Sequence, residues 1–210
     1  MTVYRPPPAL SGLSPMLLSN VARPFSDPGW GFEIKFDGYR LLASTSEDAG
    51  VRLQSRRGAD ATRWFPEIAA SLASVSAQNM IVDGEVCILD EIGRSDFDRL
   101  HARARKRGPD PSEPVVFCVF DVLVSKGKSV MELPLVRRKQ LLENLRGAER
   151  ILVVDHLPVE GELLYKHVLA LSLEGLVAKR LDSVYQPGIR TKDWLKIKRP
   201  GAVPAQRFSR

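Results

Sequence analysis

The most informative segment of the chain is Glu33-Ile34-Lys35-Phe36-Asp37-Gly38-Tyr39-Arg40. It lies within a longer stretch, residues 31–44, whose polar and apolar residues alternate as they do in a half-buried strand. Because side chains on a strand alternate between its two faces, the acids that flank Lys35 are predicted to share its face, with the apolar residues between them turned to the core. Taken alone, the segment also fits a solvated ladder of surface charges.

Three later segments repeat this combination of an apolar strand and charged side chains. They are Asp83 and Glu85 on one face of a predicted strand, Glu174 and Lys179 at the two ends of an apolar stretch, and Trp194, Lys196 and Lys198 on one face of the last predicted strand. A charged cleft over a sheet suits a polyphosphate nucleotide with a divalent metal, because lysines neutralise phosphates and carboxylate oxygens hold magnesium.

A lysine in such a cleft could act as a nucleophile if it loses its proton near neutral pH. Neighbouring cations lower the pKa of a lysine, and neighbouring acids raise it. We therefore expect Lys196, Lys198 and a bound metal to lower the pKa of Lys35, and Asp37 to raise it.

Composition and charge narrow the classes of function only slightly. The 210 residues carry a formal net charge of +6, which favours an anionic partner such as nucleic acid. No stretch is apolar enough to span a membrane and the N-terminus has no signal-peptide pattern, so we expect no membrane association. Cys87 and Cys118 are expected to be buried free thiols of a reducing cytosol, and the scattered histidines argue against a zinc site.

The order of predicted elements indicates an α+β fold of antiparallel sheets flanked by helices, because strands and helices do not alternate regularly. Strands are expected over residues 31–44, 51–55, 81–89, 115–124, 151–154, 176–179 and 193–198, with a turn at 47–50. Helices are expected within residues 15–25 and over 65–75, 135–145 and 161–173, and after a capping box at 95–98. We divide the chain into an irregular leader (1–14), one domain (15–200) and a basic tail (201–210) that we expect to be disordered.

The helix that follows the capping box is expected to end in a basic run that includes Arg103 and Arg105. These charges suit the negative end of the helix dipole. They equally have the chemistry to contact a DNA backbone. Both interpretations stay open at this point.

The run Lys35-x-Asp37-Gly38-x-Arg40 resembles motif I of the covalent nucleotidyltransferases, the superfamily of DNA ligases, RNA ligases and capping enzymes. Five further motifs follow in the order typical of that superfamily: Ser55–Gly58 resembles motif Ia, Asp83–Glu85 motif III, Val119–Leu123 motif IIIa, Glu174–Lys179 motif IV and Trp194–Lys198 motif V. The segments around Pro15–Leu17 and Tyr185–Arg190 are similar to the ligase module of bacterial end-joining DNA ligases. The resemblance covers about residues 14–200.

The resemblance implies that Lys35 attacks the α-phosphate of ATP, releases pyrophosphate and carries AMP as a phosphoramide. Lys196 and Lys198 would bind the α-phosphate and stabilise charge during the transfer. Phe120 would stack on adenine. Glu85 would bind the ribose hydroxyls and, with Glu174, would hold Mg²⁺ or Mn²⁺.

The other residues that the motifs assign to ATP binding are Asp37, Arg40, Arg56 and Lys179. Arg40 and Arg56 would contact phosphate or ribose and later the 5′-phosphate of the nick, whereas Asp37 would support a neighbouring arginine or the ribose. The implied partner is nicked or broken duplex DNA, with Arg56, Arg103 and Arg105 as weak DNA contacts. The implied setting is a bacterial cytoplasm, at the nucleoid.

The ligases of this family continue into an OB-fold that binds nucleic acid, and the dozen residues after motif V are too few to form one. We therefore expect no OB-fold here, and a separate protein could supply OB-fold or end-joining functions. Two other functions remain open. One is an RNA ligase or a GTP-using capping-type enzyme on the same scaffold, and the other is a non-catalytic module that binds DNA ends.

Overall fold

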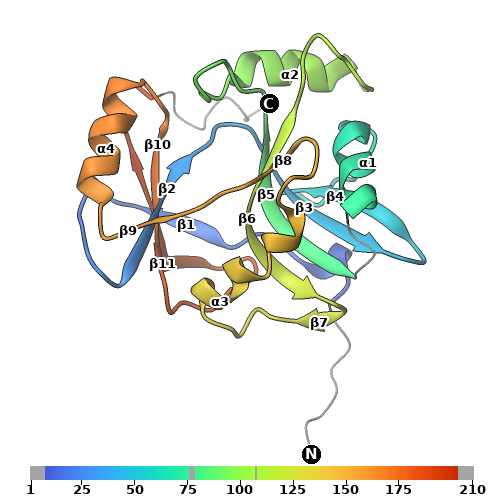
Figure 1. Cartoon of the computed structure of the whole chain (residues 1–210), viewed down its shortest axis with the longest axis horizontal. Helices are drawn as coiled ribbons and strands as arrows, with labels where there is room; N and C mark the ends of the chain where they lie inside the picture. Colours follow the sequence, from blue (N-terminus) through green and yellow to red (C-terminus); the bar gives the residue numbers. More distant parts are fainter. Residues whose placement is uncertain (1–7, 76–78, 107, 203–210) are drawn as a thin grey trace, which may run out of the picture.

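The computed structural model describes residues 8–75, 79–106 and 108–202, which form two β-sheets with helices on their outer sides (Figure 1). The first sheet has the strand order β1-β11-β10-β2-β9, namely Leu17–Asn20, Arg190–Lys198, Gly175–Arg180, Trp30–Lys35 and Leu157–Pro158. The second has the order β4-β3-β5-β6-β7, namely Gly50–Ser55, Tyr39–Ser46, Met80–Cys87, Val116–Ser125 and Lys128–Ser129, and β8 (Ile151–Val153) pairs with β6. Most neighbouring strands are antiparallel, so the predicted α+β class is confirmed.

The described residues contain four α-helices, which lie beside the sheets (Figure 1). The bounds of α1, α2, α3 and α4 are Pro66–Val75, Phe97–Lys106, Leu135–Gln140 and Gly161–Ala170. Helix α4 packs against β10 and β2 of the first sheet, whereas α1 packs against β4 and α3 against β6 of the second. Within the three described ranges, no helix is long and apolar enough to cross a membrane.

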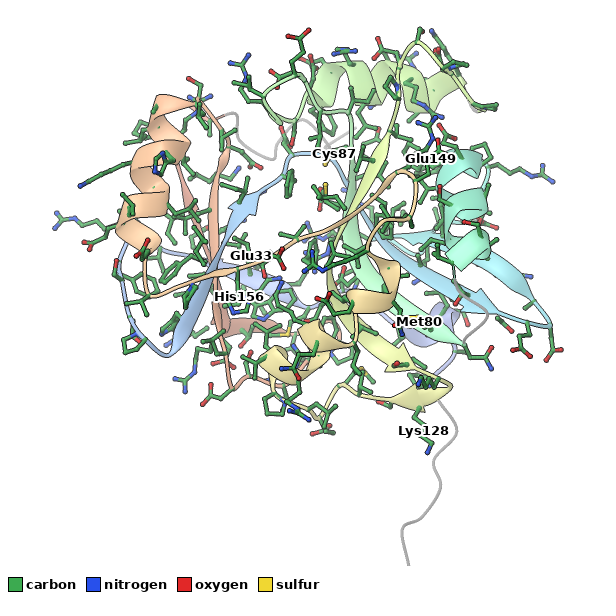
Figure 2. The ribbon with its side chains drawn as sticks, in the orientation of Figure 1. Glu33, Met80, Cys87, Lys128, Glu149 and His156 are labelled. Carbon is green, nitrogen blue, oxygen red and sulfur yellow. The ribbon has the colours of Figure 1, made fainter. Side chains whose placement is uncertain are left out.

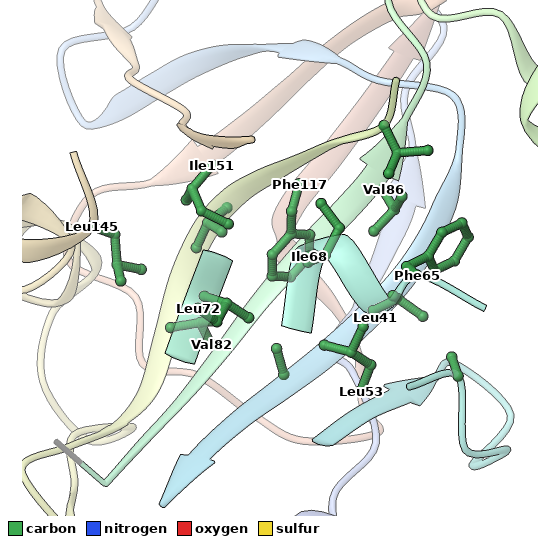
Figure 3. Close-up of a cluster of buried hydrophobic side chains, with 14 of the residues drawn as sticks. Leu41, Leu53, Phe65, Ile68, Leu72, Val82, Val86, Phe117, Leu145 and Ile151 are labelled. Carbon is green, nitrogen blue, oxygen red and sulfur yellow. The ribbon is translucent and has the colours of Figure 1, made fainter. Parts of the chain in front are cut away.

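The largest hydrophobic core lies between the second sheet and α1 (Figure 3). Leu41, Val82 and Phe117 supply it from three adjacent strands, and Ile68 and Leu72 meet them from the helix. All five side chains are buried, as expected for a half-buried sheet whose apolar face is covered by an amphipathic helix. The expected burial of both free thiols is also confirmed, since Cys87 and Cys118 lie in a smaller cluster on the other face of β5 and β6.

The stretch 31–44 is not one strand, as predicted, but two strands in different sheets. Strand β2 ends at Lys35, and β3 begins at Tyr39. The crossing requires glycine at Gly38, because a Cβ built there would lie 2.1 Å from the carbonyl oxygen of Val86. Asp37 therefore lies outside the strand that carries Lys35, and the prediction that the two share a strand face is wrong.

Other expectations differ in detail. Residues 15–25 contain the strand β1 instead of a short helix, because Leu17–Asn20 pairs in parallel with β11 and this tertiary pairing overrides the local pattern. The helix expected over 135–145 divides into α3 and a 3-10 turn at Glu143–Leu145. A 3-10 turn at Leu10–Gly12 interrupts the predicted leader, and residues 203–210 of the predicted tail lie outside the described residues.

Candidate active site

A cleft lies between the two sheets and is lined by side chains from both. The enclosed space within it is small, about 50 Å³, and the rest of the cleft is open to solvent. The charged side chains that line it are Glu33, Lys35, Arg40, Glu85 and Lys179, and the rings are those of Phe36, Phe120 and Trp194. A second hollow adjoins Lys35 and is lined in part by Asp37 and Glu174. The structure thus gathers most of the predicted site residues around one lysine.

Lys35 is the end residue of β2, and its ammonium group is paired with Glu174. Its Nζ lies 2.5 Å from Glu174 Oε2, and Lys198 Nζ lies 3.0 Å from Oε1 of the same carboxylate. We call Lys35, Glu174 and Lys198 the Glu174 cluster. It forms because Gly175 lies opposite both Lys35 and Lys198, which brings β2 and β11 to the two sides of β10.

The electrostatics of Lys35 differ from the expectation. Burial lowers its pKa, but the carboxylates of Glu174, Glu85 and Asp37 outweigh burial and raise the pKa above its ordinary value. The expected net lowering by neighbouring lysines is therefore not seen in this structure, because the three acids dominate. Burial, together with Lys35 and Lys198, instead lowers the pKa of Lys196. Lys35 must lose its pairing with Glu174 before it can act as a neutral nucleophile.

Glu85 lies on β5 and faces the cleft. Its Oε1 accepts a hydrogen bond of 3.2 Å from the backbone N–H of Gly38 and so ties the crossing segment to the second sheet. Burial raises the pKa of Glu85 to about 7, although Lys35 and Arg40 act in the opposite direction. The side chain can therefore change protonation state near neutral pH.

Arg40 reaches the cleft from β3 and is held by a buried carboxylate. Its Nε and Nη2 donate to Asp83 Oδ1 and Oδ2 over 2.6 Å and 2.7 Å, a bidentate pair. The guanidinium carbon also lies 4.6 Å from the centre of the Phe120 ring. The pair forms because Arg40 and Asp83 lie near each other on adjacent strands, whose register joins Arg40 to Glu85 and Leu42 to Asp83.

Glu33 lies two residues before Lys35 and is enclosed between the sheets (Figure 2). Its two oxygens lie 2.6 Å from Lys139 Nζ and 2.7 Å from Lys179 Nζ. We call these three residues the Glu33 cluster. Burial raises the pKa of Glu33, but the two lysines outweigh burial and hold it below its ordinary value. Burial lowers the pKa of Lys179 to about 8, and its ammonium lies 4.3 Å and 4.2 Å from the ring centres of Phe120 and Trp194.

A cleft with a paired lysine, an adjacent ring and further cations fits nucleotide chemistry, and comparison with known proteins identifies the family. The sequence model of the family described as ATP dependent DNA ligase domain matches residues 15–198. This chain belongs to that family.

Relatives support the assignment of this ligase domain. The multifunctional non-homologous end joining protein LigD of Mycolicibacterium smegmatis is 36% identical over 169 residues, which are 80% of this chain and 21% of LigD. The SPbeta prophage-derived DNA ligase-like protein LigB of Bacillus subtilis is 31% identical over 186 residues, 88% of this chain and 67% of LigB. The ligase domain thus spans about a fifth of the length of LigD.

Solved structures agree with these relatives. A mycobacterial DNA ligase D complexed with ATP and MES superposes with a TM-score of 0.79 at 33% identity, over 90% of this ligase domain and 61% of that chain. The ligase domain of LigD from M. tuberculosis gives a TM-score of 0.78 at 32% identity, over 90% and 60%. The predicted family and fold class are therefore confirmed.

The structure corrects one predicted DNA contact of the ligase domain. The Arg103 side chain is buried, where it forms an ion pair with Glu67 and donates to the carbonyl oxygen of Trp64. It joins α2 to α1 and cannot reach a DNA backbone from this position. Arg105 and Arg56 are exposed, so their DNA contacts stay predictions.

Among the described residues, no three acidic, histidine or cysteine side chains are grouped closely enough to hold a metal ion by themselves. Glu174 and Glu85 are the predicted ligands, and both act electrostatically on Lys35. Two carboxylates fit Mg²⁺ if nucleotide phosphates and water supply the remaining oxygens, a usual arrangement for this metal. The donor set therefore fits a metal that arrives with the nucleotide.

Sequence reasoning gave no role to several residues that build the site. Lys139 comes from a helix about a hundred residues after Glu33, so no local pattern could have paired them. Trp194, predicted to share a strand face with Lys196 and Lys198, received no role from the sequence; it is fully buried, and its ring also lines the cleft. Asp83 lies within motif III and Tyr185 within the ligase-like segment Tyr185–Arg190, and neither received a role, although Asp83 was predicted to share a strand face with Glu85.

Proposed function

We propose that this ligase domain transfers AMP from ATP to Lys35 Nζ and forms a lysyl–AMP intermediate for the sealing of nicked or broken duplex DNA. The observation that carries the proposal is the Glu174 cluster at the cleft, because it presents one lysine to the cleft with a second beside it. Attack by a neutral Lys35 on the α-phosphorus forms a P–N bond. The bond from the α-phosphorus to the pyrophosphate oxygen breaks, pyrophosphate leaves with the electron pair, and the amine proton passes to solvent.

Each residue around Lys35 would contact a different part of the nucleotide. Phe120 would stack on adenine, and Glu85 would bind the ribose hydroxyls. Lys196 and Lys198 would neutralise the α-phosphate as its charge develops. When the phosphates enter, they compete with Glu174 for the lysines, which frees Lys35 from the carboxylate that keeps it protonated.

Arg40, Asp37 and Lys179 would complete the nucleotide site, with Arg56 at its exposed edge. Mg²⁺ or Mn²⁺, held by Glu174 and Glu85 when bound, would supply charge neutralisation on the phosphates. Glu174 thereby has two successive partners, first a lysine and then a cation. For the DNA step, Arg56 and Arg105 offer exposed guanidinium groups to the phosphate backbone.

Incubation of the protein with ATP and Mg²⁺, followed by a denaturing gel, tests the proposal directly. Label in the α-phosphate should remain on the protein, whereas label in the γ-phosphate should not, because pyrophosphate leaves. GTP in place of ATP separates a capping-type enzyme from a ligase. Nicked DNA against nicked RNA, added to the labelled protein, then separates the two classes of ligase.

The outcomes are distinct. Loss of the α-label on addition of nicked DNA, with release of AMP, supports the proposed function. Label from GTP but not from ATP would replace it with a capping-type activity. Binding of DNA ends without any covalent label would indicate the non-catalytic module.

A further inference from the structure

Tyr185 lies beneath the cleft and has no part in the function proposed above. Its side chain is buried, and its hydroxyl donates a 2.5 Å hydrogen bond to Asp83 Oδ2. That oxygen also accepts from Arg40 Nη2. The tyrosine, the aspartate and the arginine therefore form one continuous chain of hydrogen bonds that ends at the cleft.

The same hydroxyl has a second, independent partner. It accepts a 3.0 Å hydrogen bond from the backbone N–H of Met16, the residue before β1. Burial, with the charge of Asp83, holds the pKa of Tyr185 well above its ordinary value, so the hydroxyl keeps the proton that it donates. Its ring packs edge-on against Trp194, with ring centres 5.7 Å apart.

We propose that Tyr185 is a positioning residue for AMP transfer, because its hydroxyl fixes the Asp83 carboxylate and this carboxylate aims the Arg40 guanidinium at the cleft. The inference rests on the proposed function, in which Arg40 contacts nucleotide phosphate or ribose. A carboxylate held only by the arginine can rotate with it. A carboxylate also held by a buried hydroxyl, itself bonded to the backbone at Met16, keeps one orientation.

Tyr185→Phe removes the hydroxyl and keeps the ring against Trp194. We expect the rate of lysyl–AMP formation at saturating ATP to fall about tenfold, the size of one hydrogen bond to a charged group. The ATP concentration for half-maximal rate should change by less than about threefold, because Phe120 and Lys179 still bind the nucleotide. Ser183→Ala is the matched control, since it removes another buried hydroxyl from the same loop without a link to Arg40.

A double-mutant cycle separates positioning from packing. In an Arg40→Lys background, which lacks the bidentate fork, Tyr185→Phe should reduce the rate by less than about twofold, because the hydroxyl has lost the group through which it acts. Rates are divided by the folded fraction from a denaturant titration. A tenfold loss in both backgrounds, or no loss per folded molecule, would overturn the proposal.

A measurement without catalysis keeps this inference separate from the proposed function. In arginine labelled with ¹⁵N, the Arg40 Nε–H signal, identified by its loss in Arg40→Lys, should exchange with solvent slowly in the wild type. In Tyr185→Phe it should exchange at least about tenfold faster, since the Asp83 carboxylate is less restrained. Unchanged exchange would refute the positioning role, even if the protein labels with AMP. Faster exchange in Tyr185→Phe than in the wild type, in a protein that does not label with AMP, would support the hydrogen-bond chain and refute only the enzymatic assignment.

Discussion

The Glu174 cluster and the Glu33 cluster have the same composition, one carboxylate between two lysines, and each includes a residue of β2. They differ in access to solvent. Side-chain exposures are 19%, 11% and 27% for Lys35, Glu174 and Lys198, against 9%, 3% and 2% for Lys139, Glu33 and Lys179. Phosphates and a metal can replace partners in the first cluster. The second cluster is more enclosed, so its ions depend mainly on one another.

This contrast indicates how the same arrangement of one carboxylate and two lysines can serve either chemistry or stability. Moving two residues along β2, from Lys35 to Glu33, leads from an exchangeable ion pair to an enclosed one. An enclosed pair is costly to break, because the remaining charge stays buried without compensation. An exchangeable pair is easier to break, and so it can release Lys35 for the proposed attack on ATP.

The largest effect should follow loss of Lys35, the proposed nucleophile, from the Glu174 cluster. Lys35→Ala should abolish the covalent AMP label and leave the free energy of unfolding within about 1 kcal/mol of the wild type, because the ammonium is partly solvated. Denaturing gels and urea titrations measure the two quantities. Lys192→Ala, an exposed lysine on β11, is the control and should label normally. Full labelling of Lys35→Ala would contradict the assignment.

In the Glu33 cluster, a substitution should mainly lower the free energy of unfolding. Glu33→Ala leaves Lys139 and Lys179 buried together, so we expect the free energy of unfolding to drop by about 3–5 kcal/mol. Glu174→Ala should lower it by only about 1 kcal/mol. Urea titrations of both variants at one pH give the comparison. Equal losses for the two glutamates would show that exposure does not distinguish the clusters.

Glu85 extends the comparison to a carboxylate that burial dominates. Its folded-state pKa is about 7, above the ordinary 4.5, so its contribution to stability is fully present below pH 4.5 and is lost as the pH rises through 7. Glu85→Gln should therefore remove a decline of roughly 3 kcal/mol in the free energy of unfolding over that range. Thermal or urea unfolding of both proteins from pH 5 to pH 8 tests this. Parallel pH profiles would mean that Glu85 titrates normally.

A smaller effect is expected at Phe120, whose ring lines the cleft with its centre 4.3 Å from Lys179 Nζ. Phe120→Leu should weaken ATP binding about three- to tenfold, the size of an aromatic stacking contribution. Calorimetric titration with ATP, alongside a melting curve, separates binding from folding. A collapse of the melting temperature with unchanged affinity of the folded protein would make Phe120 a core residue only.

The smallest expected effect is on DNA affinity. Here the contrast is between exposed arginines and a buried one. Arg56→Ala and Arg105→Ala should each reduce the slope of log affinity against log salt by about 0.9, one phosphate contact. Arg103→Ala should destabilise the fold and leave that slope unchanged, because its guanidinium is buried against Glu67. Titrations of nicked duplex at several salt concentrations measure the slopes. A changed slope for Arg103→Ala alone would reverse the correction.

The sequence predicted which side chains lie in the cleft better than it predicted how the strands are arranged into sheets. Periods of two along the strands correctly placed Glu85, Lys196 and Lys198 near Lys35, because strand faces are a local property. The division of residues 31–44 between two sheets was missed, since alternation looks the same whichever sheet a strand joins. Burial of Arg103 was missed for a related reason. A helix-end pattern specifies the dipole and not which neighbouring element covers the side chain.

The crossing at Gly38 couples the positions of the two sheets. Lys35 and Arg40 are five residues apart but belong to different sheets. The tight approach of Gly38 to Val86 holds the segment between them in place. A nucleotide that contacts both side chains would therefore be sensitive to the spacing of the two sheets. Packing changes far from the cleft could therefore alter the distance between Lys35 and a bound ATP without altering any side chain of the proposed site.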